Sequence, residues 1–460
     1  MNTNTMNNSH KLSQYVIATD PFSKGKFRVV YSSRSGKINI LKEEIYQSLL
    51  NGHFENNSDE ILAKLKNDAI LVPAEEDELR TIIDENHKVV AGEKALYYAI
   101  QPSANCQLGC GYCGQVHTAD KIKKDYYANL LSRIEEKLET NSQYETLSIA
   151  WFGGEPLMGL SNIKELSDKF QEMAKDRGMG YHAKMVTNGL ALKRKIFYDL
   201  VENYKLNFFE VTLDGTAEYH DTRRHTKSGN KSFDLILKNI IDITSDPRFE
   251  TSKASINIRC NVDATNHEGV EGLIELLDGL DLLSKVGFYT APIHSWGNDA
   301  HLASLEKNDY AAFEISCLQK VIKSNPNKAL VPTQRKPVVC MTVKKDSELV
   351  DAFGNVYNCT EVSQVPTYEK RQDLKINNIK EKQKDFNAER PMSNWYEDVA
   401  DGKFPCSTCS ILPICGGQCP KSWYEDISPC PSIKFNIKER LMLHVIKNAP
   451  SKKQMVPADV

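Results

Sequence analysis

The sequence has no apolar run long enough to cross a bilayer. Its first eight residues are polar and lack the apolar core of a signal peptide. Its formal net charge of −3 gives no general electrostatic reason to bind nucleic acid. These absences predict a cytoplasmic protein with neither a membrane nor a nucleic acid as partner. At 460 residues, 40% hydrophobic and 26% charged, the chain is typical of globular proteins with about three domains.

Twelve cysteines without a secretion signal indicate metal ligands in a reducing compartment rather than disulfides. Cys106, Cys110 and Cys113 lie in one short loop, with three and then two residues between them. An ordinary [4Fe–4S] cluster is bound by four thiolates, and a structural zinc site also requires four ligands. This loop offers three, and the closest further candidate is His117. A cubane held by three cysteines leaves one iron open to an outside ligand; the alternative is a zinc loop or a chance cluster of cysteines.

This loop, with Tyr112 as the aromatic residue before the last cysteine, resembles the C-x3-C-x2-C signature of the radical S-adenosylmethionine (SAM) family. The resemblance implies that the three cysteines hold a [4Fe–4S] cluster whose open iron binds SAM. It also implies that an electron from this cluster cleaves SAM and yields a 5′-deoxyadenosyl radical, which abstracts hydrogen from an unactivated C–H bond. An electron donor such as flavodoxin or ferredoxin is then an expected partner.

Residues 96–325 alternate between strand and helix patterns. Strands are predicted at 97–100, 147–152, 183–186, 208–213, 254–262 and 286–290. Amphipathic segments, such as 127–138, 233–243 and 310–322, lie between or after them. Six such repeats predict an α/β fold, a parallel and partial (β/α)6 barrel of the TIM type. The active site of such a barrel lies at the carboxyl ends of its strands.

Motifs that resemble the radical SAM pattern follow the predicted strands. A Gly-Gly-Glu-Pro motif at 153–156 is expected to bind the SAM amino group, although alone it is more often a turn. Arg224 is expected to bind the SAM carboxylate through two hydrogen bonds; the alternative is an ion pair with Asp221. His220 reads as a packed or capping side chain. The expected SAM-binding residues are Tyr112, Gly153, Gly154, Glu155, Pro156, Asn188, Thr212, Asp214, Arg224 and Asn261. His294 and Trp296 suit a substrate wall, or simply fold the last barrel loop.

Seven further cysteines match the SPASM pattern, which holds two auxiliary [4Fe–4S] clusters. By this resemblance, the outer cluster is ligated by Cys406, Cys409, Cys415 and Cys430, and the inner cluster by Cys340, Cys359 and Cys419. The inner cluster then has an iron that is open, or is filled by substrate or Cys317. Zinc is the alternative for the C-x2-C…C-x3-C portion. A hairpin turn at 353–355 would bring Cys340 and Cys359 together. Cys260 and Cys317 are most simply buried core thiols.

The first 90 residues predict a small separate domain. Segments 27–31 and 37–41 flank Ser35-Gly36 as a β-hairpin, and two short amphipathic helices and a strand at 70–72 follow. This winged-helix-like order resembles the leader-peptide recognition element of peptide maturases, which binds its ligand by strand addition. The alternative is a structural cap of the barrel. The charged stretch 75–94 predicts a helical linker.

The expected domains are therefore residues 1–90, the barrel at 96–325, the SPASM domain at 335–435, and a C-terminal helix and tail at 436–460. This order most resembles radical SAM oxidoreductases that cross-link side chains of ribosomally made (RiPP) precursor peptides through thioether or carbon–carbon bonds.

Two other functions stay open. Anaerobic sulfatase-maturing enzymes form formylglycine and typically carry a catalytic Asp directly after the second SPASM cysteine. Here Thr360 stands there, and Glu361 follows as a candidate base. A non-catalytic iron–sulfur or electron-transfer protein is the third possibility, which the intact cysteine loop and Gly-Gly-Glu-Pro motif argue against.

Overall fold

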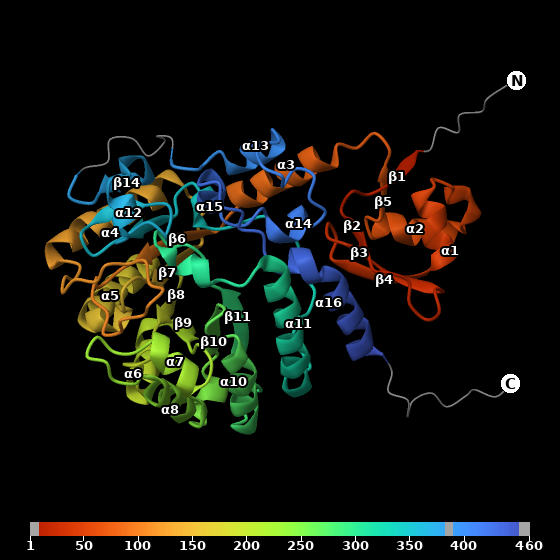
Figure 1. Cartoon of the computed structure of the whole chain (residues 1–460). Helices are drawn as coiled ribbons and strands as arrows, with labels where there is room; N and C mark the ends of the chain where they lie inside the picture. Colours follow the sequence, from red (N-terminus) through yellow and green to blue (C-terminus); the bar gives the residue numbers. More distant parts are fainter. Residues whose placement is uncertain (1–8, 382–389, 450–460) are drawn as a thin grey trace, which may run out of the picture.

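The computed structural model describes residues 9–381 and 390–449 (Figure 1). Segments 1–8, 382–389 and 450–460, which belong to the expected N-terminal domain, SPASM domain and tail, lie outside the described residues. The centre of the molecule is a nine-stranded sheet, in which six neighbouring strands run parallel. These are β6 (Ala95–Ile100), β7 (Thr146–Trp151), β8 (Gly180–Thr187), β9 (Leu206–Thr212), β10 (Ser255–Val262) and β11 (Gly287–Pro292).

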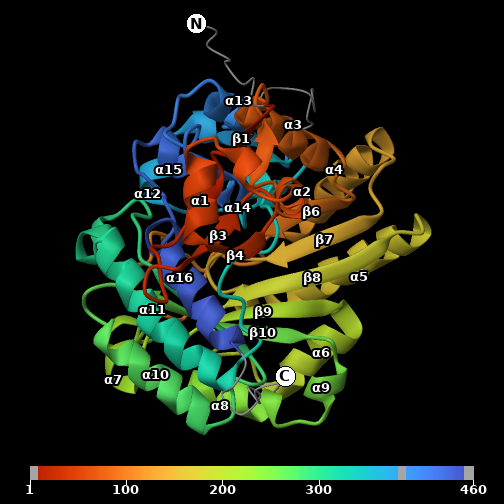
Figure 2. The ribbon, with the colours of Figure 1, turned by 90° about the vertical axis from the view of Figure 1, so that its right-hand side faces the viewer.

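Helices connect the parallel strands and cover the outer face of the sheet (Figure 2). They are α4 (Tyr127–Thr140), α5 (Leu160–Asp176), α6 (Arg194–Tyr204), α7 (Ala217–Arg223), α8 (Phe233–Thr244), α9 (Arg248–Thr251), α10 (Glu268–Gly279) and α11 (Lys307–Ser324). Leu130, Ile134 and Leu138 lie on the buried face of α4 and join the main hydrophobic core. The predicted α/β fold with a parallel sheet is confirmed.

The sheet does not close into a barrel. Among the described residues, β11 is an edge strand, and β6 pairs in parallel with β12 (Glu348–Val350), where Leu349 lies opposite Ala99. Two antiparallel strands, β13 (Asn355–Tyr357) and β14 (Lys375–Asn378), complete the sheet. The predicted hairpin turn lies between β12 and β13. Gly354 adopts φ +83° there, a conformation that suits glycine. The sheet is thus continuous across the expected boundary between barrel and C-terminal region.

The remaining C-terminal elements are short helices and one long helix. They are α12 (Pro366–Glu369), α13 (Trp395–Ala400), α14 (Leu412–Cys415), α15 (Pro420–Tyr424) and α16 (Ile433–Asn448). α16 packs along α11. As a result, α16 is held against the outside of the helix layer at α11.

The N-terminal part contains two small sheets and three helices. Its elements are β1 (His10–Leu12), β2 (Val16–Ala18), β3 (Phe27–Ser32), β4 (Lys37–Lys42), α1 (Glu43–Leu50), α2 (Asp59–Asn67), β5 (Leu71–Pro73) and α3 (Glu78–Ala91). β3 and β4 form the predicted antiparallel hairpin, which β2 extends on the β3 side. The Ser58 hydroxyl caps α2 by accepting a hydrogen bond from the Ile61 N–H. β5 pairs with β1.

The charged stretch after β5 forms a helix, as predicted, but α3 is not a mere linker. Ile82 and Ile83 of α3 are fully buried in one cluster with Trp395 and Tyr396 of α13. Its exposed side is tied to the same helix by the Arg80–Glu397 ion pair. Ile82 and Ile83 give α3 an apolar face, which is stable only against another apolar surface, and α13 provides that surface.

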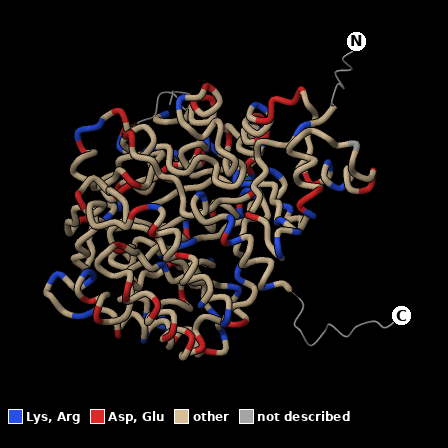
Figure 3. Tube along the Cα trace, turned by 45° about the vertical axis from the view of Figure 1, so that its right-hand side comes forward, with Lys and Arg blue, Asp and Glu red and all other residues tan. Residues whose placement is uncertain are grey.

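Charged residues of both signs are interspersed over the described chain (Figure 3). Within residues 9–381 and 390–449, no helix is both long and apolar enough to cross a membrane.

Candidate active site

The three-cysteine loop follows β6 and forms one wall of a cavity of about 290 Å³. The opposite wall comes from the carboxyl ends of β7 to β11, where loops of a parallel sheet converge. The C-terminal region adds Glu361, which follows β13. Of the predicted site residues, the cavity wall includes Cys106, Cys110, Tyr112, Cys113, Gly153, Gly154, Asn188, Thr212, Arg224, Asn261 and Glu361.

The thiols of the loop are partly to fully buried. Burial raises the pKa of Cys106 to about 12 and that of Cys113 to about 11, so both are protonated at neutral pH in the metal-free chain. A metal must therefore displace their protons. No three His, Cys, Asp or Glu side chains of the described chain lie close enough to hold a single metal ion. Three thiolates of one loop can each bind one iron corner of a cubane, so this donor set fits a cluster.

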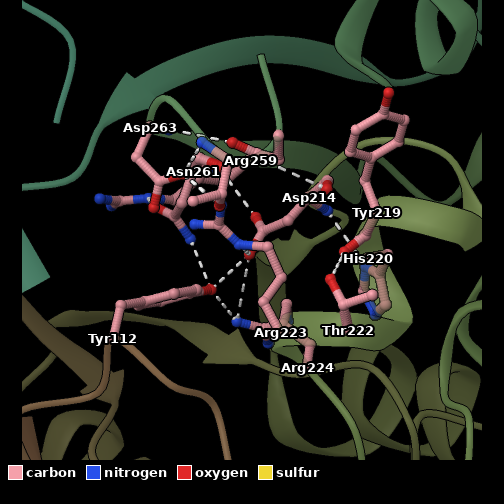
Figure 4. A network of polar contacts seen from close by, with 12 residues as sticks. Tyr112, Asp214, Tyr219, His220, Thr222, Arg223, Arg224, Arg259, Asn261 and Asp263 are labelled. Atoms are coloured by element: carbon pink, nitrogen blue, oxygen red, sulfur yellow. Dashed lines mark hydrogen bonds and ion pairs between the residues drawn. The ribbon is translucent and has the colours of Figure 1, made fainter. Parts of the chain in front are cut away.

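Tyr112 connects this loop to two strand ends (Figure 4). Its hydroxyl donates a hydrogen bond to Asp214 Oδ2 at 2.6 Å and accepts one from Asn261 Nδ2 at 3.0 Å. It also accepts a hydrogen bond from Arg224 Nη1. The guanidinium carbon of Arg223 lies 5.1 Å from the ring centroid of Tyr112. Burial holds the pKa of Tyr112 well above its ordinary value, so the hydroxyl keeps its proton.

Asp214 is completely buried behind the cavity wall and positions its neighbours. Its Oδ1 accepts a hydrogen bond from the Asn261 backbone N–H at 2.8 Å. Its own backbone N–H donates to His220 Nδ1, and His220 Nε2 lies 3.0 Å from the Ser232 hydroxyl. His220 is thus a packed, hydrogen-bonded side chain. Burial lowers its pKa to about 2, so it remains neutral.

Arg224 does not pair with Asp221. Instead, Asp221 Oδ1 accepts hydrogen bonds from the backbone N–H groups of Ser232 and Phe233 at the start of α8. Arg224 is 6% exposed, and its Nε has no hydrogen-bond partner among the described residues. A buried guanidinium N–H without a partner is costly. Arg224 also lines the cavity, and a guanidinium there fits a carboxylate ligand, such as that of SAM.

The Gly-Gly-Glu-Pro motif lies beside the loop, and its two glycines face the cavity. Glu155 does not line the cavity. Its carboxylate accepts hydrogen bonds from the Leu157 and Asn188 backbone N–H groups and from the Thr187 hydroxyl. Glu155 therefore fixes the end of β8, and the glycines provide the surface that a ligand can touch. Pro156 is buried outside the lining.

Asn188 lies next to the cluster loop. Its side-chain Nδ2 is 3.6 Å from Cys106 Sγ, a weak N–H···S hydrogen bond. His117 Nε2 is 3.9 Å from Cys113 Sγ, and burial lowers the pKa of His117 to about 4. Both side chains can donate to cluster sulfur atoms, a type of contact that tunes iron–sulfur centres.

Sequence reasoning missed two inward-facing residues of the cavity, Glu210 and Arg259. Arg259 Nη1 lies 3.6 Å from Glu210 Oε1, and Arg259 Nε donates to Asn261 Oδ1 at 2.8 Å. The alternation of side chains between the two faces of a strand could have found them. Each precedes a predicted site residue, Thr212 or Asn261, by two positions and therefore lies on the same face. Gln115, also missed, accepts a hydrogen bond from the Gly154 N–H and carries no such signal.

The loop after β11 joins the barrel to the C-terminal region. The Trp296 indole N–H donates to the Glu361 backbone oxygen at 2.9 Å, and His294 Nε2 lies 3.8 Å from Glu361 Oε2. Burial acts to raise the pKa of Glu361. The hydrogen bond and charge of His294, with the positive charge of Arg259, outweigh it, so the pKa is lowered. Glu361 is therefore an ionised carboxylate at the cavity.

The seven C-terminal cysteines fall into two groups in space. The thiols of Cys409, Cys415 and Cys430 lie near enough to Cys406 to add to the rise of its pKa, whose largest cause is burial. Burial is also the largest cause of the raised pKa of Cys359, and Cys419 and Cys340 lie near enough to add to that rise. The outer group lines a small pocket of its own. This grouping has the composition that the SPASM resemblance implies.

Cys317 does not lie with the inner group. It belongs to the barrel core with Cys260, and both are almost fully buried. The possibility that Cys317 completes the inner set is therefore wrong, because α11 directs this residue toward β10 and β11 in the core. Both are buried core thiols, as predicted.

Comparison with known proteins identifies the domain that contains this cavity. Residues 100–245 match the family model of the radical SAM superfamily. The chain contains a radical SAM domain. The matched region includes the cysteine loop, the Gly-Gly-Glu-Pro motif and Arg224. The radical SAM superfamily implies a [4Fe–4S] cluster and SAM, and the thiol loop and the Arg224 guanidinium at the cavity fit them.

Relatives of this radical SAM protein include sulfatase-maturating enzymes. The serine-type anaerobic sulfatase-maturating enzyme of Bacteroides thetaiotaomicron is 26% identical over 72% of this chain and 84% of that protein. The cysteine-type enzyme of Clostridium novyi is 31% identical over 32% of this chain and 40% of that protein. The structure of native anSMEcpe with bound AdoMet and Cp18Cys peptide covers 76% of this chain and 97% of that chain, with a TM-score of 0.56 and 17% identity. That similarity is one of fold.

Proposed function

We propose that this protein is a radical SAM oxidoreductase that removes hydrogen from a side chain of a peptide or protein substrate. One observation carries the proposal: a single cavity is lined by the three-cysteine loop, by Arg224 and by Glu361. When bound, the cluster and SAM together supply a 5′-deoxyadenosyl radical that abstracts hydrogen from an unactivated C–H bond.

The residues of the cavity divide into three roles. Cys106, Cys110 and Cys113 hold the cluster. Arg224 would bind the SAM carboxylate, and the backbone at Gly153 and Gly154 would approach the amino group. Asn188, Thr212 and Asn261, which also line the cavity, would contact the rest of SAM. Apolar side chains of the wall, Leu108, Phe152, Val186, Ile293 and Trp296, exclude water.

Glu361 is the candidate base on the substrate side. When a substrate radical is oxidised, it would pass one electron to an auxiliary cluster and release a proton, which an ionised carboxylate at the cavity can accept. The His294 contact orients this carboxylate and keeps it ionised. Because Glu361 comes from the C-terminal region, the base and the SAM-binding residues approach the substrate from different sides.

The C-terminal region holds two auxiliary [4Fe–4S] clusters in this proposal. Cys406, Cys409, Cys415 and Cys430 would ligate the outer cluster, and Cys340, Cys359 and Cys419 the inner one. The separation of the seven thiols into these groups supports the assignment. The inner set has one thiolate fewer than an ordinary cluster requires.

We favour peptide cross-linking as the specific reaction, because the N-terminal part offers a strand edge for a leader peptide. β4 is an edge strand of its sheet, and Ile40 on it is 52% exposed. An extended leader can add to this edge as a further strand. The cross-link forms by loss of two hydrogens from the substrate.

Sulfatase maturation is the second candidate, which the named relatives favour. The carboxylate of Glu361 at the cavity also fits this reaction, because Glu361 lies one position after the place where such enzymes carry their catalytic Asp. Here the product is formylglycine, made by oxidation of a serine or cysteine side chain.

One experiment tests these reactions. Anaerobically reconstituted protein is incubated with SAM, dithionite and either the precursor peptide encoded beside its gene or sulfatase-motif peptides with Ser or Cys. We expect 5′-deoxyadenosine and a precursor lighter by two hydrogens that does not react with a hydrazine. A hydrazine-reactive aldehyde on a sulfatase peptide would instead select sulfatase maturation. Absence of SAM cleavage would reject both in favour of an electron-transfer protein.

A further inference from the structure

The hydroxyl of Tyr112 uses its full hydrogen-bonding capacity on residues around the proposed SAM site. It has one donor and two acceptor positions. The donor goes to Asp214, and the acceptors receive the N–H groups of Asn261 and Arg224. These partners come from the end of β9, the end of β10 and the residue after α7. The family pattern requires only an aromatic ring here, so these contacts are specific to a tyrosine.

The hydroxyl lies between two groups that would otherwise attract each other. Arg224 Nη1 is 4.0 Å from Asp214 Oδ2, at the limit of an ion pair, and the Tyr112 hydroxyl bonds to both. Without the hydroxyl, the guanidinium could move onto the buried carboxylate and form a direct charge-assisted pair. Such a pair would satisfy Arg224 within the protein and draw it away from the cavity wall.

We propose that the Tyr112 hydroxyl is a spacer that keeps Arg224 off Asp214, so that the guanidinium stays available to SAM. Tyr112 is a positioning residue in this role, because it acts through Arg224. It also joins the cysteine loop to the SAM-binding strands, so that the geometry of the loop and of the carboxylate site are set together. The inference rests on the proposed function and deepens it.

The test is a Tyr112→Phe variant, which keeps the ring and removes only the hydroxyl. SAM binding to reconstituted, unreduced protein is measured by equilibrium dialysis. We expect the SAM dissociation constant to rise about 10- to 100-fold, as for loss of a hydrogen bond to a charged group. Iron content and the electron paramagnetic resonance (EPR) signal of the reduced, SAM-free cluster should not change. Turnover at saturating SAM should fall much less than affinity, which separates positioning from folding.

Two further variants sharpen the test. Tyr219→Phe removes a nearby hydroxyl whose hydrogen-bond partner among the described residues is Glu268. The affinity for SAM should stay at the wild-type level. Adding Asp214→Asn to Tyr112→Phe removes the competing carboxylate and should restore part of the affinity. Unchanged affinity in Tyr112→Phe would overturn the inference, and a double variant that loads its cluster without regaining affinity would overturn the spacer role. If the wild type itself fails to bind SAM, the proposed function fails instead.

Discussion

The carboxylate of Glu348 in the C-terminal region forms a two-pronged ion pair with Arg133 in helix α4 of the barrel. Arg133 Nε and Nη2 lie 2.6 and 2.8 Å from the two carboxylate oxygens. Lys137 Nζ lies 2.7 Å from the same carboxylate, and the Tyr98 hydroxyl donates to it at 3.0 Å. All four side chains are buried. Since β12 also pairs with β6, the C-terminal region and the barrel form one structural unit.

Replacing Glu348 with glutamine should destabilise the protein strongly. The change removes the carboxylate that two buried cations share, a loss that typically costs about 3–5 kcal/mol. Chemical denaturation of the metal-free, reduced chain measures it. Asp242→Asn, which breaks the exposed Lys238–Asp242 pair, is the matched control and should change stability by less than about 1 kcal/mol. Equal effects of both variants would contradict a structural role for the buried pair.

The same carboxylate predicts an acid dependence of stability. Burial acts to raise the pKa of Glu348, but Lys137 and Arg133 outweigh it and hold the pKa far below its ordinary value. In the unfolded chain the Glu348 carboxylate takes up a proton at about pH 4.3, whereas in the folded protein it stays ionised at that pH. The contribution is therefore complete above that pH and is lost as the pH falls toward the folded pKa. Denaturation midpoints from pH 7 to 3 should fall more steeply for the wild type than for Glu348→Gln.

Iron analysis tests the three cysteine groups independently of activity. Reconstituted wild type should hold about 12 iron atoms per chain, four for each cluster. Replacing Cys106, Cys110 and Cys113 together with alanine should leave about eight and abolish SAM cleavage. Replacing the buried core thiols Cys260 and Cys317 with alanine is the control and should leave the iron content unchanged. Zinc in place of iron after anaerobic reconstitution would disprove the cluster assignment.

Glu361→Gln separates SAM cleavage from substrate chemistry. The variant keeps the shape of the side chain but cannot accept a proton, so product formation should fall about 10²- to 10⁴-fold. Formation of 5′-deoxyadenosine should persist, because Arg224 and the cysteine loop are intact. Wild-type activity should fall as the pH drops toward the lowered pKa of Glu361, where the base becomes protonated. Full product yield from the glutamine variant would exclude Glu361 as the base.

Ile40→Lys tests the leader-binding edge. Ile40 faces outward from β4, so a lysine there should leave folding intact but weaken strand addition. We expect weaker binding of the full precursor, measured by fluorescence anisotropy of a labelled leader. Leu50→Lys, at a position on α1 that is equally exposed at 50%, is the control and should bind normally. If both variants bind the leader like the wild type, β4 is not the docking edge.

The parallel sheet and the cysteine loop were predictable because their signals are local. Strand β7 is a short and mostly apolar run, β10 alternates polar and apolar residues, and the loop is defined by its own spacing. The role of α3 was misjudged, because Ile82 and Ile83 acquire a partner only when α13, more than 300 residues later, packs against them. Glu210 and Arg259 were missed because an inward-facing charge on a strand has no meaning until the cavity is known.

The sequence by itself determined that three thiols share one loop and that glycines and an arginine follow at strand ends, because neighbours along the chain set these spacings. Only the tertiary structure decided which groups meet across the cavity. Tyr112 and Asp214 are 102 positions apart, and Glu361 reaches the cavity from beyond the barrel. Such meetings depend on the register of β9 and β10 and on the pairing of β12 with β6. Local chain geometry does not encode that long-range packing.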